Sequence, residues 1–288
     1  MNFVTLGNDC PEILTYNVRG LSQLYPRGHI FLYDWGHSPR TLDRLSRANS
    51  NVVVVKWPRA HPGNYMFEKV ACIEDCFRKH SNQPLMYFDS DVIVDDVINE
   101  VFEDERWDIA ATWRPDSGYG YEEYGVGSWL NAGVLFINNI RPDHSLAFLS
   151  EWLKRCERWD DKRWWLDQVE LIRLFSNADV DLSAGSDRIG SVIVDGVAVR
   201  CKTLHYTVYN FFPEVYTPCP EYEPQKAKVL HLKSSWRKVK FRMLPGSLKS
   251  LWITWIKTNY GNNKILRISN LKFNAILRFV LARLRNIR

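Results

Sequence analysis

The first hundred residues alternate short apolar runs with longer amphipathic stretches, and this alternation limits the possible folds more than any other feature. Strands are predicted at 2–6, 29–33, 52–56 and 85–88, with helices between them at 11–24, 39–48 and 66–79. The valines at 52–55 are typical of a strand that is buried on both faces of its sheet. Strands separated by helices of this length form parallel sheets with crossover helices, so the pattern predicts an α/β fold.

The alternation continues less regularly beyond residue 100. Strands are predicted at 109–112, 133–137 and 229–232, and helices at 145–159 and 165–175. Irregular β-like segments occupy 180–216. Two further helical patterns, both apolar and basic, begin near residue 248 and are separated by residues 260–263. We therefore expect a catalytic domain over 1–245 and a basic amphipathic helical tail over 246–288.

The composition is that of a folded soluble protein, because 45% of the 288 residues are hydrophobic and 25% are charged. We find no apolar stretch of the roughly 18 to 20 residues that a membrane-spanning helix needs, and no signal-peptide pattern at the start. The six cysteines are scattered, without a C-x2-C pair, which indicates reduced thiols rather than disulfides or a structural zinc site. We expect a cytoplasmic protein.

The charges are segregated along the chain. Residues 1–223 carry 22 Lys and Arg with all 33 Asp and Glu, whereas residues 224–288 carry 16 basic residues and no acidic one. A basic tail indicates contact with a polyanionic surface, and the acidic body argues against a nucleic-acid clamp formed by the main domain. We expect an anionic membrane surface as partner, and no nucleic acid.

The most informative motif is the pair Asp89 and Asp91, which follows the apolar strand predicted at 85–88. Alternate side chains of an extended backbone point to the same side, so the two carboxylates can converge on one Mg²⁺ or Mn²⁺ ion, which in turn can hold a diphosphate. Ligands of open α/β sheets bind at the carboxyl ends of the strands, where this pair lies. The alternative is a solvated acidic turn.

Three other segments contain polar residues that suit a ligand site. His231 ends a strand-like run and is followed by Arg237, so it is a candidate ligand of Mn²⁺ beside a cation for phosphate. Asp167 and Gln168 open an amphipathic helix, and the stretch 131–134 begins a buried strand with Asn-Ala-Gly-Val. Each has a plainer explanation: a hydrogen-bonded histidine, a helix-start residue and a turn.

Taken together and in this order, the four segments resemble family 8 of the nucleotide-sugar glycosyltransferases, which includes glycogenin and bacterial lipopolysaccharide galactosyl- and glucosyltransferases. The resemblance covers roughly residues 1–240. It implies a GT-A fold, a Rossmann-like, mostly parallel sheet flanked by helices, and transfer of a hexose from a UDP-sugar with retention of configuration. It also implies that Asp89, Asp91 and His231 together chelate Mn²⁺ or Mg²⁺.

The resemblance implies roles for further residues. Asp167 and Gln168 would contact sugar hydroxyls and lie near the anomeric carbon, and they are the candidate catalytic residues. Lys69 matches a basic residue of the family, although its spacing to the Asp pair is a few residues longer. The residues implied to bind the nucleotide sugar are Leu6, Asn8, Asp9, Lys69, Ser90, Asn131, Ala132, Ser234 and Arg237.

The sequence departs from the family in its C-terminal motif. The family pattern H-x-x-G-x-x-K is replaced here by His231, Ser234 and Arg237 at the same spacing. Charge is retained, but the planar guanidinium of Arg binds phosphate with a different geometry from that of Lys. Two routes to retention stay open: a double displacement with Asp167 or Gln168 as nucleophile, and a front-face reaction in which the departing phosphate accepts the proton.

Two rival functions share parts of the pattern. Haloacid-dehalogenase-like phosphatases also have D-x-D after a strand, but there the motif lies on the first strand of the domain, and here three strands precede it. A non-catalytic membrane scaffold is the second rival. For residues 246–288, a helix in the membrane interface beside a lipid-linked acceptor competes with a C-terminal helix that packs on the domain.

Overall fold

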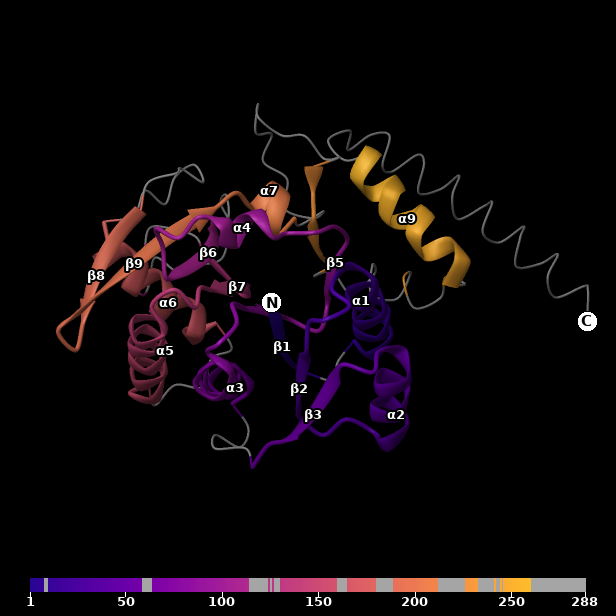
Figure 1. Cartoon of the computed structure of the whole chain (residues 1–288), viewed down its shortest axis with the longest axis horizontal. Coiled ribbons are helices and arrows are strands. Elements are labelled where there is room, and N and C mark those ends of the chain that lie inside the picture. Colours follow the sequence, from indigo (N-terminus) through magenta and orange to yellow (C-terminus); the bar gives the residue numbers. More distant parts are fainter. Residues whose placement is uncertain are drawn as a thin grey trace, which may run out of the picture.

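The computed structural model describes residues 1–7, 10–58, 64–113, 124, 126, 130–159, 165–179, 189–211, 226–232, 241, 244 and 246–259 (Figure 1). Among these residues, no helix combines the length and the apolar character that crossing a membrane requires. The five described cysteines are buried and free, as expected for reduced thiols.

The core of the fold is one eight-stranded mixed sheet, which confirms the predicted α/β class. In order across the sheet the strands are β3 (Val52–Lys56), β2 (Ile30–Asp34), β1 (Asn2–Leu6), β4 (Leu85–Phe88), β7 (Leu130–Ile137), β6 (Ile109–Trp113), β9 (Val197–Leu204) and β8 (Ile189–Val194). The first four strands are parallel, and β6 pairs in parallel with β9. Strand β7 runs antiparallel to both neighbours, so its first residues lie beside the end of β4.

Helices cover both faces of the sheet because successive strand residues point to opposite sides. Val4 packs with α3 (Tyr65–His80), α5 (Pro142–Glu157) and α6 (Leu166–Asn177). Its neighbour Phe3 packs on the other face, with α1 (Pro11–Leu24), α2 (Pro39–Ala48) and the short α4 (Glu100–Glu103). Helix α7 (Tyr206–Tyr209) follows β9.

The helix starts follow from local chemistry. Helices α1, α2 and α5 have Pro in their first turn, where the missing N–H costs no helical hydrogen bond. The N-cap of α2 is Ser38, whose hydroxyl accepts a hydrogen bond from the backbone N–H of Thr41. Asn64 caps α3 in the same way, through Phe67 N–H. These signals explain why the predicted and observed bounds of the first three helices agree to within a residue.

A second sheet and the last described helix lie against the α1 side of the molecule. Strand β5 (Val92–Val94) pairs antiparallel with β10 (Val229–His231). Helix α9 (Gly246–Asn259) buries Trp252 and Ile253 in a small cluster that includes Ile13 of α1 and Ile93 of β5. The first part of the predicted tail therefore packs on the domain, while residues 260–288 lie outside the described residues (Figure 1).

Strand β3 differs from its prediction. It was expected to be buried on both faces, but it is the outermost strand of the sheet, and Val53 is 40% exposed. Four valines are compatible with an inner or an edge position, because the position depends on strand order and not on the strand's own residues. Lys56 ends the strand with a charge, which is typical of an exposed edge.

The edge position predicts that Val53→Thr changes the free energy of unfolding by less than about 0.5 kcal/mol, because the hydroxyl remains in water and the β-branched shape is kept. Val4→Thr in the central strand β1 is the matched control. Its hydroxyl would be buried, at a cost of about 1 to 3 kcal/mol. Urea denaturation measures both values. Equal costs for the two variants would mean that β3 is covered in solution.

Candidate functional site

The two aspartates are held at the point where the large and small sheets meet. Asp89 directly follows β4, and its N–H donates to the carbonyl of Gly133 in β7 at 2.9 Å. The Tyr87 hydroxyl donates to Asp89 Oδ1 at 2.5 Å. Burial, and then the Asp89 charge, raise the pKa of Tyr87 well above its ordinary value, so this hydroxyl keeps its proton. Asp91 directly precedes β5 and is buried.

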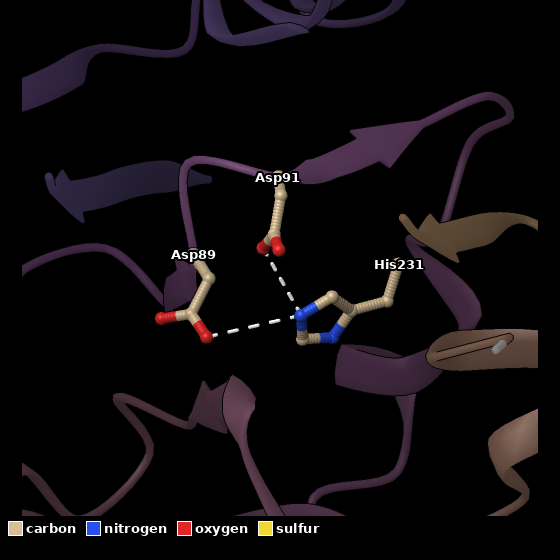
Figure 2. A group of neighbouring side chains, drawn as sticks. All are labelled: Asp89, Asp91 and His231. Carbon is tan, nitrogen blue, oxygen red and sulfur yellow. Dashed lines mark ion pairs between the residues drawn. The ribbon is translucent and has the colours of Figure 1, made fainter. Parts of the chain in front are cut away.

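The pairing of β5 with β10 brings His231 to the aspartates. His231 lies opposite Val92 in this ladder, and the N–H of Leu232 donates to the carbonyl of Asp91 at 2.9 Å. The His231 Nε2 atom is 3.1 Å from Asp91 Oδ1 and 3.9 Å from Asp89 Oδ2 (Figure 2). Two side chains from the connection between β4 and β5 thus converge with one from β10, although these segments are far apart in the sequence.

This group has the chemistry of a divalent-metal site. One ligand atom from each of Asp89, Asp91 and His231 lies within 4.8 Å of the others. Space beside them is kept open by Gly133, since a Cβ atom there would collide with His231 Cε1 and come within 2.6 Å of Asp89 Oδ2. Carboxylates are ligands that Mn²⁺ and Mg²⁺ share, and the imidazole favours the transition metal Mn²⁺ over Mg²⁺, which takes oxygen ligands. The residues therefore fit the predicted ion.

The second nitrogen of His231 contacts an asparagine. His231 Nδ1 is 3.0 Å from Asn210 Oδ1, and Asn210 Nδ2 donates to Thr112 Oγ1 at 2.7 Å and to Asn131 Oδ1 at 3.0 Å. Asn210 is held beside His231 by backbone bonds, because Phe211 N–H donates to Val229 and His231 N–H donates to Phe211. The side-chain contacts of Asn210 with His231, Thr112 and Asn131 were not predicted from the sequence.

The predicted residues of α6 and β7 form an adjoining group. Gln168 Oε1 accepts hydrogen bonds from Asn131 Nδ2 at 3.1 Å and from the N–H of Ala132 at 3.3 Å. The register between β6 and β7 shifts just before Thr112, and such bulges commonly redirect backbone groups next to sites. Asn131, Ala132 and Gln168 are thus brought together, beside the candidate metal ligands.

Lys69 and Asp167 form a buried ion pair in this group. Lys69 Nζ contacts Asp167 Oδ2, donates to the carbonyl of Ala132 at 3.3 Å and lies over the ring of Tyr87. Burial opposes the charged form of Lys69, but the attraction of Asp167 and Asp89 outweighs it and raises the lysine pKa. Burial raises the pKa of Asp167, and Lys69 offsets only part of that rise. The structure thus brings the distantly spaced Lys69 next to Asp167.

The end of β1 lies beside the loop that carries the two aspartates, since a Cβ atom on Gly7 would be 3.4 Å from Ser90 Oγ. The carbonyl of Leu6 accepts a hydrogen bond from the Tyr65 hydroxyl at 2.6 Å, and Gly7 has a φ of 121°, which favours glycine. The ring Nε2 of His37 donates to the Gly7 carbonyl at 2.8 Å. Tyr65 and His37 were missed in the sequence because no motif contains them. Ser90, between the two aspartates, is buried.

Four residues predicted to bind the nucleotide sugar lie outside the described part of the chain. They are Asn8 and Asp9 after β1, and Ser234 and Arg237 after β10. Their proposed contacts with nucleotide and phosphate therefore stay predictions.

No protein-family model matches the sequence, and no curated protein is significantly similar to it. Among solved structures, the chain resembles the galactosyltransferase LgtC in complex with donor and acceptor sugar analogues, with a TM-score of 0.52 and 14% identity, over 87% of this chain and 99% of that one. It also resembles the bifunctional glycosyltransferase WbbM, with a TM-score of 0.55 and 14% identity, over 93% of this chain and 51% of that one.

A third similar structure is the glycosyltransferase GlyE in Streptococcus pneumoniae, with a TM-score of 0.52 and 17% identity, over 93% of this chain and 63% of that one. This chain has the fold of these enzymes. The predicted GT-A-like α/β architecture is therefore confirmed. At such low identities the likeness concerns the fold alone, so membership of family 8 stays a prediction.

Proposed function

We propose that this protein is a metal-dependent glycosyltransferase that moves a hexose from a UDP-sugar to a saccharide or lipid-linked saccharide acceptor. The convergence of Asp89, Asp91 and His231 at the carboxyl end of β4 carries the proposal. This is the edge at which open α/β sheets bind their ligands. The fold, shared with solved glycosyltransferases, supports the same assignment.

The three ligands would hold Mn²⁺, or Mg²⁺, against the diphosphate of the donor. When bound, such an ion supplies Lewis-acid stabilisation of the negative charge that develops on the leaving UDP. Two neighbouring residues would shape the site: Gly133 leaves room beside Asp89, and Tyr87 orients the Asp89 carboxylate by its hydrogen bond. Ser234 and Arg237 are the proposed phosphate contacts after β10.

On the sugar side, the contacts favour the front-face route to retention. A double displacement needs an enzyme nucleophile at the anomeric carbon. Asp167 is only 2% exposed and is neutralised by Lys69, and the carbonyl oxygen of Gln168 already accepts two hydrogen bonds. These contacts support a role in orienting sugar hydroxyls for Asp167 and Gln168, with the departing phosphate as proton acceptor.

The basic tail supports a lipid-linked acceptor in this proposal. Helix α9 packs on the domain through Trp252, so the proposed membrane contact rests on residues 260–288 and not on this helix. That stretch is rich in Lys and Arg and has no acidic residue. Basic segments of this kind are attracted to anionic lipid, where a lipid-linked acceptor would be found.

A donor-hydrolysis screen tests the proposed function. We expect the wild-type protein to release UDP from one or more UDP-sugars, faster with Mn²⁺ than with EDTA, and we expect Asp89→Ala and His231→Ala to lose this stimulation. Asp95→Ala is the control. The Asp95 carboxylate is exposed and forms an ion pair with Lys257, outside the candidate metal site. Cleavage of phosphate esters without turnover of any sugar nucleotide would instead favour the phosphatase alternative.

A further inference from the structure

The side-chain amide of Asn131 has a fixed orientation, which determines the direction of the neighbouring hydrogen bonds. The backbone N–H of Gly133 can only donate, and it lies 2.9 Å from Asn131 Oδ1. The Asn131 atom that faces this N–H is therefore the amide oxygen. The amide group that approaches this oxygen from Asn210 at 3.0 Å must then be the NH₂ group.

The orientation of Asn210 in turn fixes the proton on His231. With its NH₂ group on Asn131 and Thr112, Asn210 turns its oxygen toward His231 Nδ1 at 3.0 Å. A carbonyl oxygen accepts, so Nδ1 carries the hydrogen. In the neutral ring, Nε2 then has the lone pair, and Nε2 is the atom that faces Asp91 at 3.1 Å.

We propose that Asn210 is a positioning residue that holds His231 in the tautomer able to bind a metal. The inference rests on the proposed function, in which His231 is a metal ligand. Asn210 is 0% exposed and uses both amide hydrogens and its oxygen in the described contacts. Partners of this kind, behind a histidine ligand, fix the ring orientation and raise its basicity.

The same hydrogen bonds extend to the proposed sugar side. Asn131 donates from Nδ2 to Gln168 Oε1 at 3.1 Å, so one continuous chain of hydrogen bonds joins His231, Asn210, Asn131 and Gln168. The direction of each of these hydrogen bonds follows from one fact, that the backbone N–H of Gly133 donates to Asn131 Oδ1. Asn210 therefore links the position of the metal ligand to that of a residue proposed to contact the donor sugar.

Metal affinity and ring tautomer test the role of Asn210 without any catalytic assay. We expect Asn210→Leu to weaken Mn²⁺ binding about 10- to 100-fold, measured on the full chain by electron paramagnetic resonance. Asn210→Asp keeps an oxygen acceptor for His231 and should lose less affinity. If Asn210 served only in packing, the apolar, similarly shaped Leu would bind Mn²⁺ at least as well as Asp, and that order would overturn the proposal.

A buried asparagine away from the site serves as the control. Asn138 follows the far end of β7, and Asn138→Leu should lower stability without changing Mn²⁺ affinity. If the Asn210 variants fail to fold, the wild-type protein still gives an answer. Nitrogen-15 shifts of the His231 ring, at a pH where it is neutral, should show hydrogen on Nδ1. Hydrogen on Nε2 would overturn the proposal.

The outcomes separate this inference from the proposed function. Tight Mn²⁺ binding by the wild type that is unaffected by both Asn210 variants would remove the role of Asn210 and leave the metal site intact. Failure of the wild type to bind Mn²⁺ or Mg²⁺ would remove the proposed metal dependence, and with it the inference. The ring tautomer, measured in the same samples, then reports only on the hydrogen bond to Asn210.

Discussion

Lys69→Met is expected to destabilise the protein by about 3 to 5 kcal/mol at neutral pH, because it leaves the Asp167 carboxylate buried without its cation. Met has a similar length and keeps most of the packing of the Lys side chain against Tyr87. The loss of folding free energy is therefore mainly electrostatic. Urea denaturation at pH 7 to 8 measures it, as a lower midpoint with an unchanged slope.

The cost should depend on pH. Burial already raises the pKa of Asp167 in the folded protein, and removal of Lys69 raises it further. Below the unfolded value of about 3.9, the carboxyl group is protonated in both states and adds no penalty. The penalty grows as the pH rises through the folded-state pKa. The stability gap between Lys69→Met and the wild type should therefore be widest at pH 8 and narrow toward pH 5.

Two controls identify the buried pair as the cause. Lys79→Met removes an exposed pair with Asp75 on the same helix and should cost less than about 1 kcal/mol. Adding Asp167→Asn to Lys69→Met removes the stranded charge, so the double variant should recover much of the lost stability. A Lys69→Met variant as stable as Lys79→Met would contradict the ion pair.

The local pattern was sufficient to predict the first half of the fold. The helix starts at Pro11 and Pro39, and the strand that ends before Asp89, depend on residues within a turn or two of each other. Such short-range preferences are present in the sequence itself. Strand order is not, and this is why β3 was expected inside the sheet although it lies at the edge.

The candidate metal site was predictable only in part from residue chemistry. The spacing of Asp89 and Asp91 indicates that the two carboxylates bind one cation. Their contact with His231 depends on the pairing of β5 with β10, which are more than 130 residues apart in the sequence. The position of His231 at the end of a strand-like run made it a candidate ligand, but its place beside the two aspartates was expected only from the resemblance to a family of glycosyltransferases. The three side chains implied by that resemblance do converge, and their role as metal ligands stays a proposal.

The supporting residues could not be predicted in the same way. Lys69 was matched to a family residue despite a longer spacing, and its pairing with Asp167 depends on how α3 packs near α6. The contact of Asn210 with His231 joins two segments that no short motif connects. Tyr87, within the predicted strand, contacts Asp89 by a hydroxyl that apolar periodicity does not reveal.

Gly133→Ala is expected to lower Mn²⁺ affinity and the rate of the proposed sugar transfer by about 100-fold or more, because misplacement of site groups by an ångström has effects of this size. The new Cβ would collide with the His231 ring and lie 2.6 Å from Asp89 Oδ2 and 2.8 Å from Asn131 Oδ1. Asp89 and His231 are proposed metal ligands, so the methyl group acts on the site directly. The buried surroundings leave the ring of His231 little room to move aside.

Gly20→Ala in helix α1 separates this effect from a general effect of adding a methyl group. A Cβ there meets only Val94 O at 3.8 Å, so the variant should be more stable by about 0.5 to 1 kcal/mol and bind Mn²⁺ as the wild type does. Gly133→Ala should cost about 1 to 3 kcal/mol of stability through crowding, which leaves enough folded protein for titration with Mn²⁺. A folded Gly133→Ala variant with wild-type Mn²⁺ affinity would show that the ion is not held between Asp89 and His231, since the methyl group occupies the space between them.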